Sequence, residues 1–221
     1  MATTNSTVFS FPAARERSST RGLAEIVIGF AAIMAVLWLP TREQLIVGPI
    51  VLLTPLALVL AQKPTFDQLG LGLRGLVSSW WILPAAVGLM ILGIFVTREL
   101  GTYHSLYAPD FAHVGGYVVW TIYQQFLLQD YFMPRLSRVS TGTAAIAVAA
   151  ILFAVAHIPN VPLVIATLVW GAVSCLLFRR YRSLWILGLA QGMLGLCFAV
   201  CVPDAWHHHM RVGLGYFHYR G

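Results

Sequence analysis

Charge is scarce in this sequence. Charged residues make up 10% of its 221 residues and hydrophobic residues 58%, whereas an ordinary soluble domain is about 25% charged and about 45–50% apolar. So few charges cannot cover the surface of a soluble globule of this size, which excludes a cytosolic enzyme, a disordered chain and a nucleic-acid-binding module. The composition instead predicts an all-α, polytopic integral membrane protein.

Alternating strand patterns, repeats and paired cysteines are also missing. The apolar blocks are continuous, whereas a membrane β-barrel would need alternating strands. The three cysteines, Cys175, Cys197 and Cys201, lie inside apolar blocks. An odd number of cysteines within membrane segments argues against a disulfide framework, so we interpret them as small buried hydrophobic residues.

The apolar blocks, several of them bounded by prolines, predict a bundle of about seven transmembrane helices. Each block approaches the roughly 20 residues that cross about 30 Å of hydrocarbon. We place the spans near residues 23–40, 46–61, 79–97, 113–133, 143–158, 161–178 and 184–202. This divides the chain into a disordered cytosolic tail (1–22), a transmembrane domain (23–202) and an extracytosolic C-terminal tail (203–221).

The distribution of basic residues predicts a cytosolic N-terminus. With that orientation, ten of the 14 Lys and Arg residues lie on inner segments and four on outer segments, which is the bias of the positive-inside rule. The basic pI of about 9.6 then reflects membrane orientation and not nucleic-acid binding. All seven histidines fall on the outer side. A bacterial inner membrane is the location that we expect.

The predicted fourth span carries a run of amide side chains. Gln125 and Gln129 share one helix face with Thr121, and Gln124 lies one step around. Polar side chains at membrane depth cost several kcal/mol unless they are partnered, so they face a protein interior or a wet cavity. Gln191 is the strongly polar residue of the seventh span. Two interpretations stay open: hydrogen bonds that hold the helices together, or a functional polar site.

Two ionisable residues accompany these amides. His157 ends the fifth span, and its imidazole is the group in this region able to do acid–base chemistry near neutral pH. A neutral histidine at the end of a span is also often structural. Asp130 lies near the inner end of the fourth span, where we expect it to pair with Arg135 or Arg138.

The order and spacing of these residues resemble the CPBP family of intramembrane endopeptidases, which includes CAAX-processing proteases and bacteriocin-related Abi proteins. That family has Glu-Glu-x-x-x-Arg on one helix, Phe-x-x-x-His on the next and a late His-x-x-x-Asn/Asp. The corresponding residues of this sequence are Gln124-Gln125-x-x-x-Gln129, Phe153-x-x-x-His157 and Gln191-x-x-x-Gly195. The resemblance covers roughly residues 65–202. It implies a CPBP-type fold and catalytic positions at Gln124, Gln125, Gln129, His157 and Gln191.

The replacements change the chemistry that the resemblance implies. In the family a glutamate activates water, while histidine and asparagine position it and stabilise the oxyanion. An amide is not a base at any accessible pH, Gln129 lacks the positive charge of arginine, and Gly195 has no side chain. His157 alone keeps its chemistry. Loss of a general base typically removes about 10²–10⁴-fold of rate, so the sequence leaves open whether the chain is an enzyme.

A histidine run at the outer face indicates a metal site as another option. His207, His208 and His209 follow Asp204 closely, and imidazole and carboxylate ligands suit zinc. These three histidines are the candidate metal ligands. The alternative is that they lie at the headgroup boundary, where one end of a side chain meets water and the other meets apolar groups.

Three functions follow as hypotheses. The first is the family's cleavage of a membrane-associated peptide or protein, with His157 as the remaining catalytic group. The second is a catalytically inactive scaffold, assembly factor or accessory subunit of a membrane complex. The third is a metal-binding membrane protein that uses the outer histidines. The partners that we expect are membrane lipid and a transmembrane substrate or binding protein, and no nucleic acid.

Overall fold

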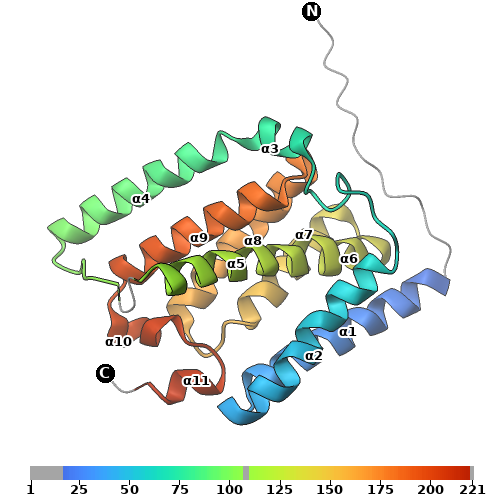
Figure 1. Ribbon diagram of the computed structural model, residues 1–221, viewed down its shortest axis with the longest axis horizontal. Helices are drawn as coiled ribbons and strands as arrows, with labels where there is room; N and C mark the ends of the chain where they lie inside the picture. The colour runs from blue at the N-terminus through green and yellow to red at the C-terminus, as the bar shows by residue number, and fades with distance from the viewer. Residues whose placement is uncertain (1–16, 107–109, 220–221) are drawn as a thin grey trace, which may run out of the picture.

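The computed structural model describes residues 17–106 and 110–219, and the regular structure in these ranges is helical throughout. Figure 1 shows long helices packed against one another, with short helices near their ends. The helices are α1 (Arg17–Leu37), α2 (Thr41–Leu60), α3 (Leu73–Ser79), α4 (Ile82–Glu99), α5 (Phe111–Phe126), α6 (Met133–Val139), α7 (Gly142–Val155), α8 (Val161–Tyr181), α9 (Leu184–Cys201), α10 (Asp204–His207) and α11 (Leu214–Phe217), with a π-helical segment η1 (Leu127–Phe132) and a 3₁₀ turn η2 (His208–Met210).

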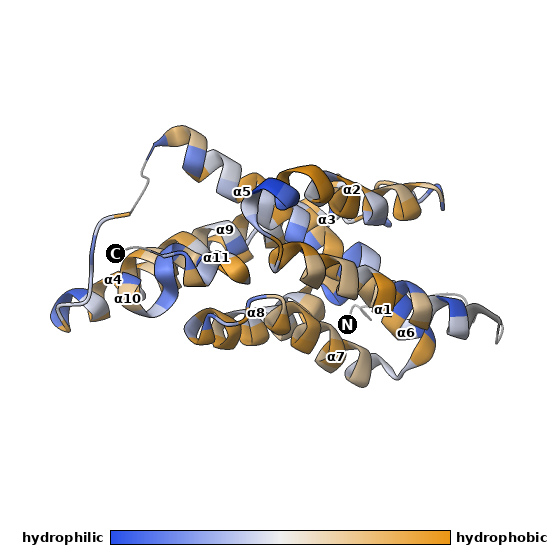
Figure 2. Ribbon diagram, turned by 90° about the horizontal axis from the view of Figure 1, so that it is seen from below, coloured by the Kyte–Doolittle hydropathy of each residue, from blue (hydrophilic) through white to orange (hydrophobic). Residues whose placement is uncertain are grey.

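Within the described residues, five helices are long and apolar enough to cross a membrane, namely α1, α2, α4, α8 and α9. Figure 2 shows apolar residues along much of the length of these helices, and many of them are exposed. On α4, for example, Leu89, Ile91 and Phe95 are exposed. Such faces fit lipid tails and not water, so the all-helical integral membrane protein expected from the composition is confirmed.

The helices corresponding to the predicted fourth and fifth spans are shorter. α5 has 16 residues and α7 has 14. The backbone stays in the right-handed helical region through the junctions at Leu127 and Met133, so α5, η1 and α6 form a continuous rod. π-helical segments of this kind occur frequently at functional sites, and η1 contains Gln129 and Asp130.

Short helical elements lie in parts of both predicted tails. α1 begins at Arg17, so residues 17–22 are helical, while residues 1–16 lie outside the described ranges. Residues 204–217, which we call the C-terminal segment, contain α10, η2 and α11. The segment is held by backbone contacts: the Gly213 N–H donates to the Ile158 carbonyl at 2.8 Å.

Side-chain caps mark the starts of three helices. Asp110 accepts a hydrogen bond from the His113 N–H at α5, Asn160 accepts from Leu163 at α8, and Ser183 accepts from Ile186 at α9. Asp, Asn and Ser are preferred at this position because their oxygens satisfy a free backbone N–H. The same N–H donation, together with the His113 side chain, holds the pKa of Asp110 below its ordinary value.

Glycines allow α5 and α9 to pack closely. A Cβ atom at Gly188 would lie 2.7 Å from the Ile122 Cα, and one at Gly192 would lie 3.1 Å from the Thr121 Oγ1. Small residues four apart let helix backbones approach in this way. The Thr121 hydroxyl also donates to the Gly188 carbonyl at 2.9 Å. The amides of α5 are therefore brought directly against α9.

An ion pair between the buried Arg135 and the half-buried Glu25 attaches α1 to this core. The Arg135 Nε lies 2.6 Å from the Glu25 Oε2, and the Arg135 guanidinium also donates to the Tyr131 carbonyl. The predicted pairing of Asp130 with Arg135 or Arg138 is not what the structure shows, because the Arg135 guanidinium is bound to Glu25 of α1 and Arg138 is exposed. The charge that faces Asp130 is instead that of Arg182, just after α8.

Candidate functional site

A chain of amide hydrogen bonds runs through the middle of the bundle. The Gln129 Nε2 donates to the Gln125 Oε1 at 3.1 Å, and the Gln125 Nε2 donates to the Gln191 Oε1 at 2.6 Å. Gln125 is fully buried, and Gln129 and Gln191 are 2% and 8% exposed. The structure thus brings together three of the predicted site residues, which lie up to 66 positions apart in the sequence.

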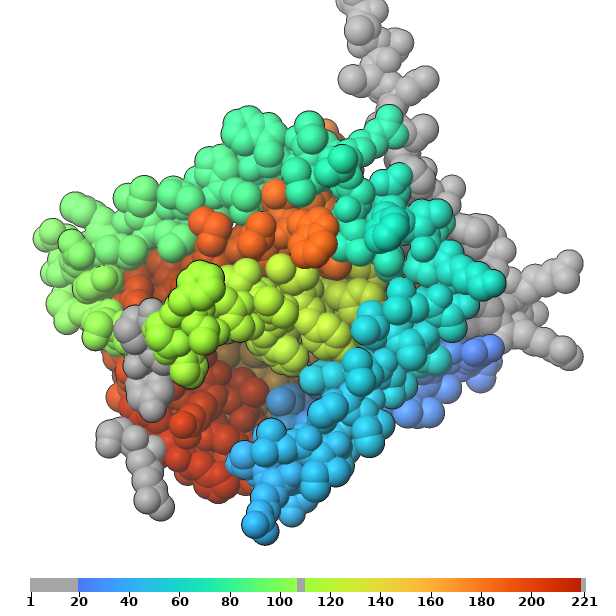
Figure 3. Space-filling view, in the orientation of Figure 1, coloured from blue at the N-terminus to red at the C-terminus, as the bar shows by residue number. Residues whose placement is uncertain are grey.

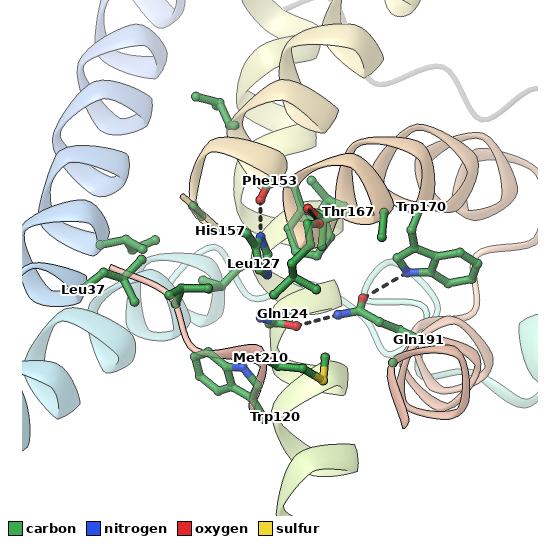
Figure 4. Close-up of a pocket in the computed structure, with 18 of the residues that line it drawn as sticks. Leu37, Trp120, Gln124, Leu127, Phe153, His157, Thr167, Trp170, Gln191 and Met210 are labelled. Atoms are coloured by element: carbon green, nitrogen blue, oxygen red, sulfur yellow. Dashed lines mark hydrogen bonds between the residues drawn. The ribbon is translucent and has the colours of Figure 1, made fainter. Parts of the chain in front are cut away.

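Gln191 is the branch point of this chain. Its Nε2 donates to the Gln124 Oε1 at 2.5 Å, and its Oε1 also accepts from the Trp170 Nε1 at 3.0 Å (Figure 4). The indole N–H can only donate, so it fixes which end of the Gln191 amide is the oxygen. This orientation sets the direction of every other amide in the chain.

The other end of the chain reaches α8. The Gln129 Nε2 lies 3.3 Å from the Ser174 Oγ and 3.7 Å from the Cys175 Sγ. Sequence reasoning missed the contribution of α8, although Trp170 and Ser174 are four residues apart and therefore share a helix face. Two polar side chains at this spacing in an apolar span could have predicted that α8 contributes to the polar site.

His157 lies just beyond the end of α7, and its ring is held in one orientation. The Nδ1 lies 2.6 Å from the Phe153 carbonyl oxygen (Figure 4), and the Phe153 ring packs edge-on against the imidazole at 5.0 Å between centroids. A carbonyl only accepts hydrogen bonds, so the neutral imidazole carries its proton on Nδ1. The Nε2 keeps its lone pair.

A large apolar cavity connects these polar groups. It has a volume of about 560 Å³ and lies between α1 and α2 on one side and α5, α7, α8 and α9 on the other. We call it the central cavity; its lining includes Phe30, Val36, Leu52, Trp120, Gln124, His157, Trp170, Gln191, Phe198 and Met210. Figure 3 shows the surface hollowed between α2, α5 and the C-terminal segment. The polar groups Gln124, His157 and Gln191 therefore face a mainly apolar space.

The described lining of the central cavity contains no acidic or basic side chain apart from His157. Gln124 is the predicted site residue that both ends the amide chain and borders the cavity, while Gln125 and Gln129 are buried behind it. The arrangement supplies hydrogen-bond donors and acceptors and one imidazole lone pair. It supplies no carboxylate that could remove a proton from water.

Gly195, which also lines the cavity, is packed against a side chain of α5. A Cβ atom at this position would lie 2.0 Å from the Tyr117 hydroxyl. The Tyr117 hydroxyl thus occupies the space that a side chain at position 195 would need. Sequence reasoning identified the missing side chain at Gly195 but not the residue that fills its place.

The three consecutive histidines do not converge on one point. His207 donates from Nε2 to the Val202 carbonyl at 2.8 Å and accepts from the Met210 N–H at Nδ1. His208 instead stacks on Tyr216, with ring centroids 3.9 Å apart. The His209 Nε2 lies 3.2 Å from an Asp204 oxygen. Burial lowers the pKa of His207, although the Val202 carbonyl and Asp204 act in the opposite direction.

A comparison with protein-family models finds one that matches this part of the chain. Residues 111–197 match the Rce1-like family, described as type II CAAX prenyl endopeptidase Rce1-like. No curated protein and no solved structure matches the chain. The matched residues run from α5 almost to the end of α9, so they include the whole amide chain and His157. The resemblance drawn from the sequence motifs is confirmed.

Proposed function

Residues 111–197 belong to the Rce1-like, CAAX-protease-type family, and from this premise we propose that the chain uses the family's fold to bind a membrane protein without cleaving it. One observation carries the proposal. The family's glutamate pair corresponds to Gln124 and Gln125, and both amides are hydrogen-bonded to Gln191. A network whose donors and acceptors already match one another is a binding and packing element.

The ligand that we propose is an apolar transmembrane segment of a partner protein. The central cavity is lined mainly by aliphatic and aromatic side chains, with a few polar groups on one wall, as is typical of sites that bury an apolar ligand and orient it by a few hydrogen bonds. Gln124 and His157 line the cavity, and both can hydrogen-bond to a peptide carbonyl or N–H group. The partner's side chains would fill the apolar part.

We further propose that the rod of α5, η1 and α6 and the short helix α7 lie within the membrane beside the five longer helices. This gives the seven spans expected from the sequence, a cytosolic N-terminus and a place in a bacterial inner membrane. The match of the family to residues 111–197 supports it, because these two elements carry Gln124, Gln125 and His157. Cysteine accessibility at loop positions on each side would test the orientation.

Peptide cleavage is the second candidate function, and His157 favours it. The Phe153 carbonyl fixes the imidazole with an unprotonated Nε2, which is the form able to accept a proton from water. Cleavage by this group would proceed without the carboxylate of the family's motif. If it occurs, His157→Ala must abolish it.

Photo-crosslinking from inside the cavity tests the binding proposal. A photoreactive residue at Leu127, which lines the cavity and is 9% exposed, is expected to give one covalent adduct with a membrane protein. Ala166 also lines the cavity, so a tryptophan at this position should fill the cavity and prevent the adduct. Ala166→Trp is therefore combined with the crosslinker. Ile151→Trp is the matched control, because Ile151 of α7 is 51% exposed and does not line the cavity.

The outcomes separate the two functions. If the chain binds its partner without cleaving it, the adduct contains the full-length partner. Ala166→Trp removes this adduct and Ile151→Trp preserves it. Cleavage predicts a shortened partner peptide that becomes full-length with His157→Ala. A crosslinker at Leu127 that captures lipid alone, with no protein adduct, would overturn the proposed function.

A further inference from the structure

The connection between α4 and α5 meets the C-terminal segment through a second group of polar side chains. His104 comes from that connection, and its backbone N–H donates to the Val200 carbonyl at 3.1 Å. Asp204 and His207 come from α10. One ligand-type atom from each of these three residues lies within 4.8 Å of the other two. This group is separate from the amide chain.

The His104 ring has an unused nitrogen that points at a carboxylate. Its Nδ1 lies 3.2 Å from the Thr102 carbonyl, so in the neutral ring Nδ1 carries the proton and Nε2 keeps a lone pair. The Nε2 is buried and has no hydrogen-bond partner among the described residues. It lies 3.8 Å from the Asp204 Oδ1, which is too far for a hydrogen bond.

A lone pair that faces a carboxylate oxygen is unfavourable unless a proton or a metal ion lies between them. The Thr102 carbonyl acts on His104 as outer partners act on metal-binding histidines, because it fixes the tautomer and leaves Nε2 basic. The carboxylate is oriented as well, since the His209 Nε2 lies 3.2 Å from Asp204 Oδ2. Two ligands of suitable chemistry are therefore already in place.

His207 supplies the third ligand at a suitable distance. Its Nε2 lies 3.3 Å from the Asp204 Oδ1. Tetrahedral zinc, with bonds of about 2.0–2.2 Å, places neighbouring ligand atoms roughly 3.3–3.5 Å apart. Metal binding requires the His207 proton to move from Nε2 to Nδ1, so the Val202 carbonyl loses its donor and the Met210 N–H loses its acceptor.

We propose that His104, Asp204 and His207 bind a zinc ion that fastens the C-terminal segment to the connection between α4 and α5. Two imidazoles and one carboxylate form a zinc-type ligand set with one position open. Beside this group lies a smaller cavity of about 200 Å³, lined in part by His113 and Met210. Met210 lines the central cavity as well, so the bound ion would hold the C-terminal segment over the outer end of that cavity.

Zinc binding to the full-length protein in detergent tests this assignment. Protein stripped with a chelator is titrated with Zn²⁺ against a competing indicator, and bound zinc is counted by mass spectrometry. We expect one equivalent. His104→Ala and Asp204→Asn should each weaken binding at least about tenfold. His218→Ala is the matched control, because His218 is exposed and lies outside the group, and it should bind zinc like the unaltered protein.

Two further measurements keep the test decisive if a variant is unstable. Co²⁺ in place of zinc should give the visible absorption of a site with nitrogen and oxygen ligands, and Asp204→Asn should reduce it. Zinc should slow hydrogen exchange of residues 204–210 in the unaltered protein but not in His104→Ala. The proposal is overturned if no stoichiometric zinc binds, or if His104→Ala and His218→Ala bind it equally.

Discussion

The amide nitrogen of Gln125 lies 2.6 Å from the Gln191 Oε1, so this hydrogen bond joins α5 to α9 between two buried side chains. The Trp170 N–H shares the same oxygen. An acid at position 125 would place a second acceptor opposite Gln191. If the Gln191 amide turned to compensate, its nitrogen would meet the Trp170 N–H, which is also a donor. The two family glutamate positions are therefore not equivalent in this protein.

Gln125→Glu should destabilise the protein more than Gln124→Glu. The first removes a buried donor and strands an acceptor, which costs roughly 1–3 kcal/mol and more if the acid is charged. The second keeps the oxygen that accepts from Gln191 and places the acid at the cavity. Thermal unfolding in detergent checks the order of the two transition temperatures. Equal or reversed temperatures would contradict the assigned direction of the amide chain.

Gly188→Ala should separate α5 from α9. The added Cβ would lie 2.7 Å from the Ile122 Cα, which is backbone and cannot turn aside, so overpacking of about 1–3 kcal/mol is expected. Gly88→Ala in α4 is the control, because its Cβ would have no neighbour within 4 Å. Removing a helical glycine there should be neutral or slightly stabilising. Similar losses in both variants would show that close packing is not the cause.

Arg135→Met should detach α1 from the core. The variant removes the Glu25 pair and the donor to the Tyr131 carbonyl, but Glu25 is 21% exposed and keeps Arg21 as a partner. The expected loss is therefore about 1–3 kcal/mol. Arg138→Met is the matched control, since Arg138 is exposed and surface substitutions usually change stability by about 0.5 kcal/mol or less. Urea or thermal unfolding distinguishes the two. A second substitution, Glu25→Gln, should recover part of the loss in Arg135→Met and would fail to do so if the pair were unimportant.

Asn160→Ala and Asn160→Asp should separate the two tasks of this buried side chain. Its Oδ1 caps α8 by accepting from the Leu163 N–H, and its Nδ2 donates to the His207 and Arg211 carbonyls. Alanine removes both functions, whereas aspartate keeps the cap and loses the donors. Hydrogen exchange should therefore rise in residues 204–212 for both variants. The start of α8 should lose protection from hydrogen exchange in Asn160→Ala alone. Equal loss in both variants would show that the Oδ1 and the Nδ2 do not have separate roles.

Most of the bundle could be predicted from hydropathy, because a helix is the structure that satisfies its own backbone in lipid. The predicted spans near 161–178 and 184–202 begin where α8 and α9 begin. The predicted spans miss that α5, η1 and α6 form one continuous rod, because hydropathy does not register the change from α to π hydrogen bonding. The fold of the C-terminal segment also escaped prediction, since it depends on Asn160, some 47 residues away from its partner His207.

The sequence could predict which residues make up the candidate site but not which hydrogen bonds join them. Motif order identified Gln124, Gln125, Gln129, His157 and Gln191 as neighbours. Which amide donates and which accepts depends on Trp170, whose N–H orients Gln191 from a different helix. The expected partners of Asp130, Arg135 or Arg138, were chosen because they are close in sequence, but Arg135 pairs in space with Glu25 of α1.

The amide chain between Gln129 and Gln124 has a physical consequence for a protein in an energised membrane. An ionised side chain responds to the membrane potential, with about 2.3 kcal/mol per elementary charge for each 100 mV crossed. Carboxamides carry no net charge and do not titrate at accessible pH. The four glutamines therefore give the bundle interior a polarity that neither a proton gradient nor a change of voltage alters.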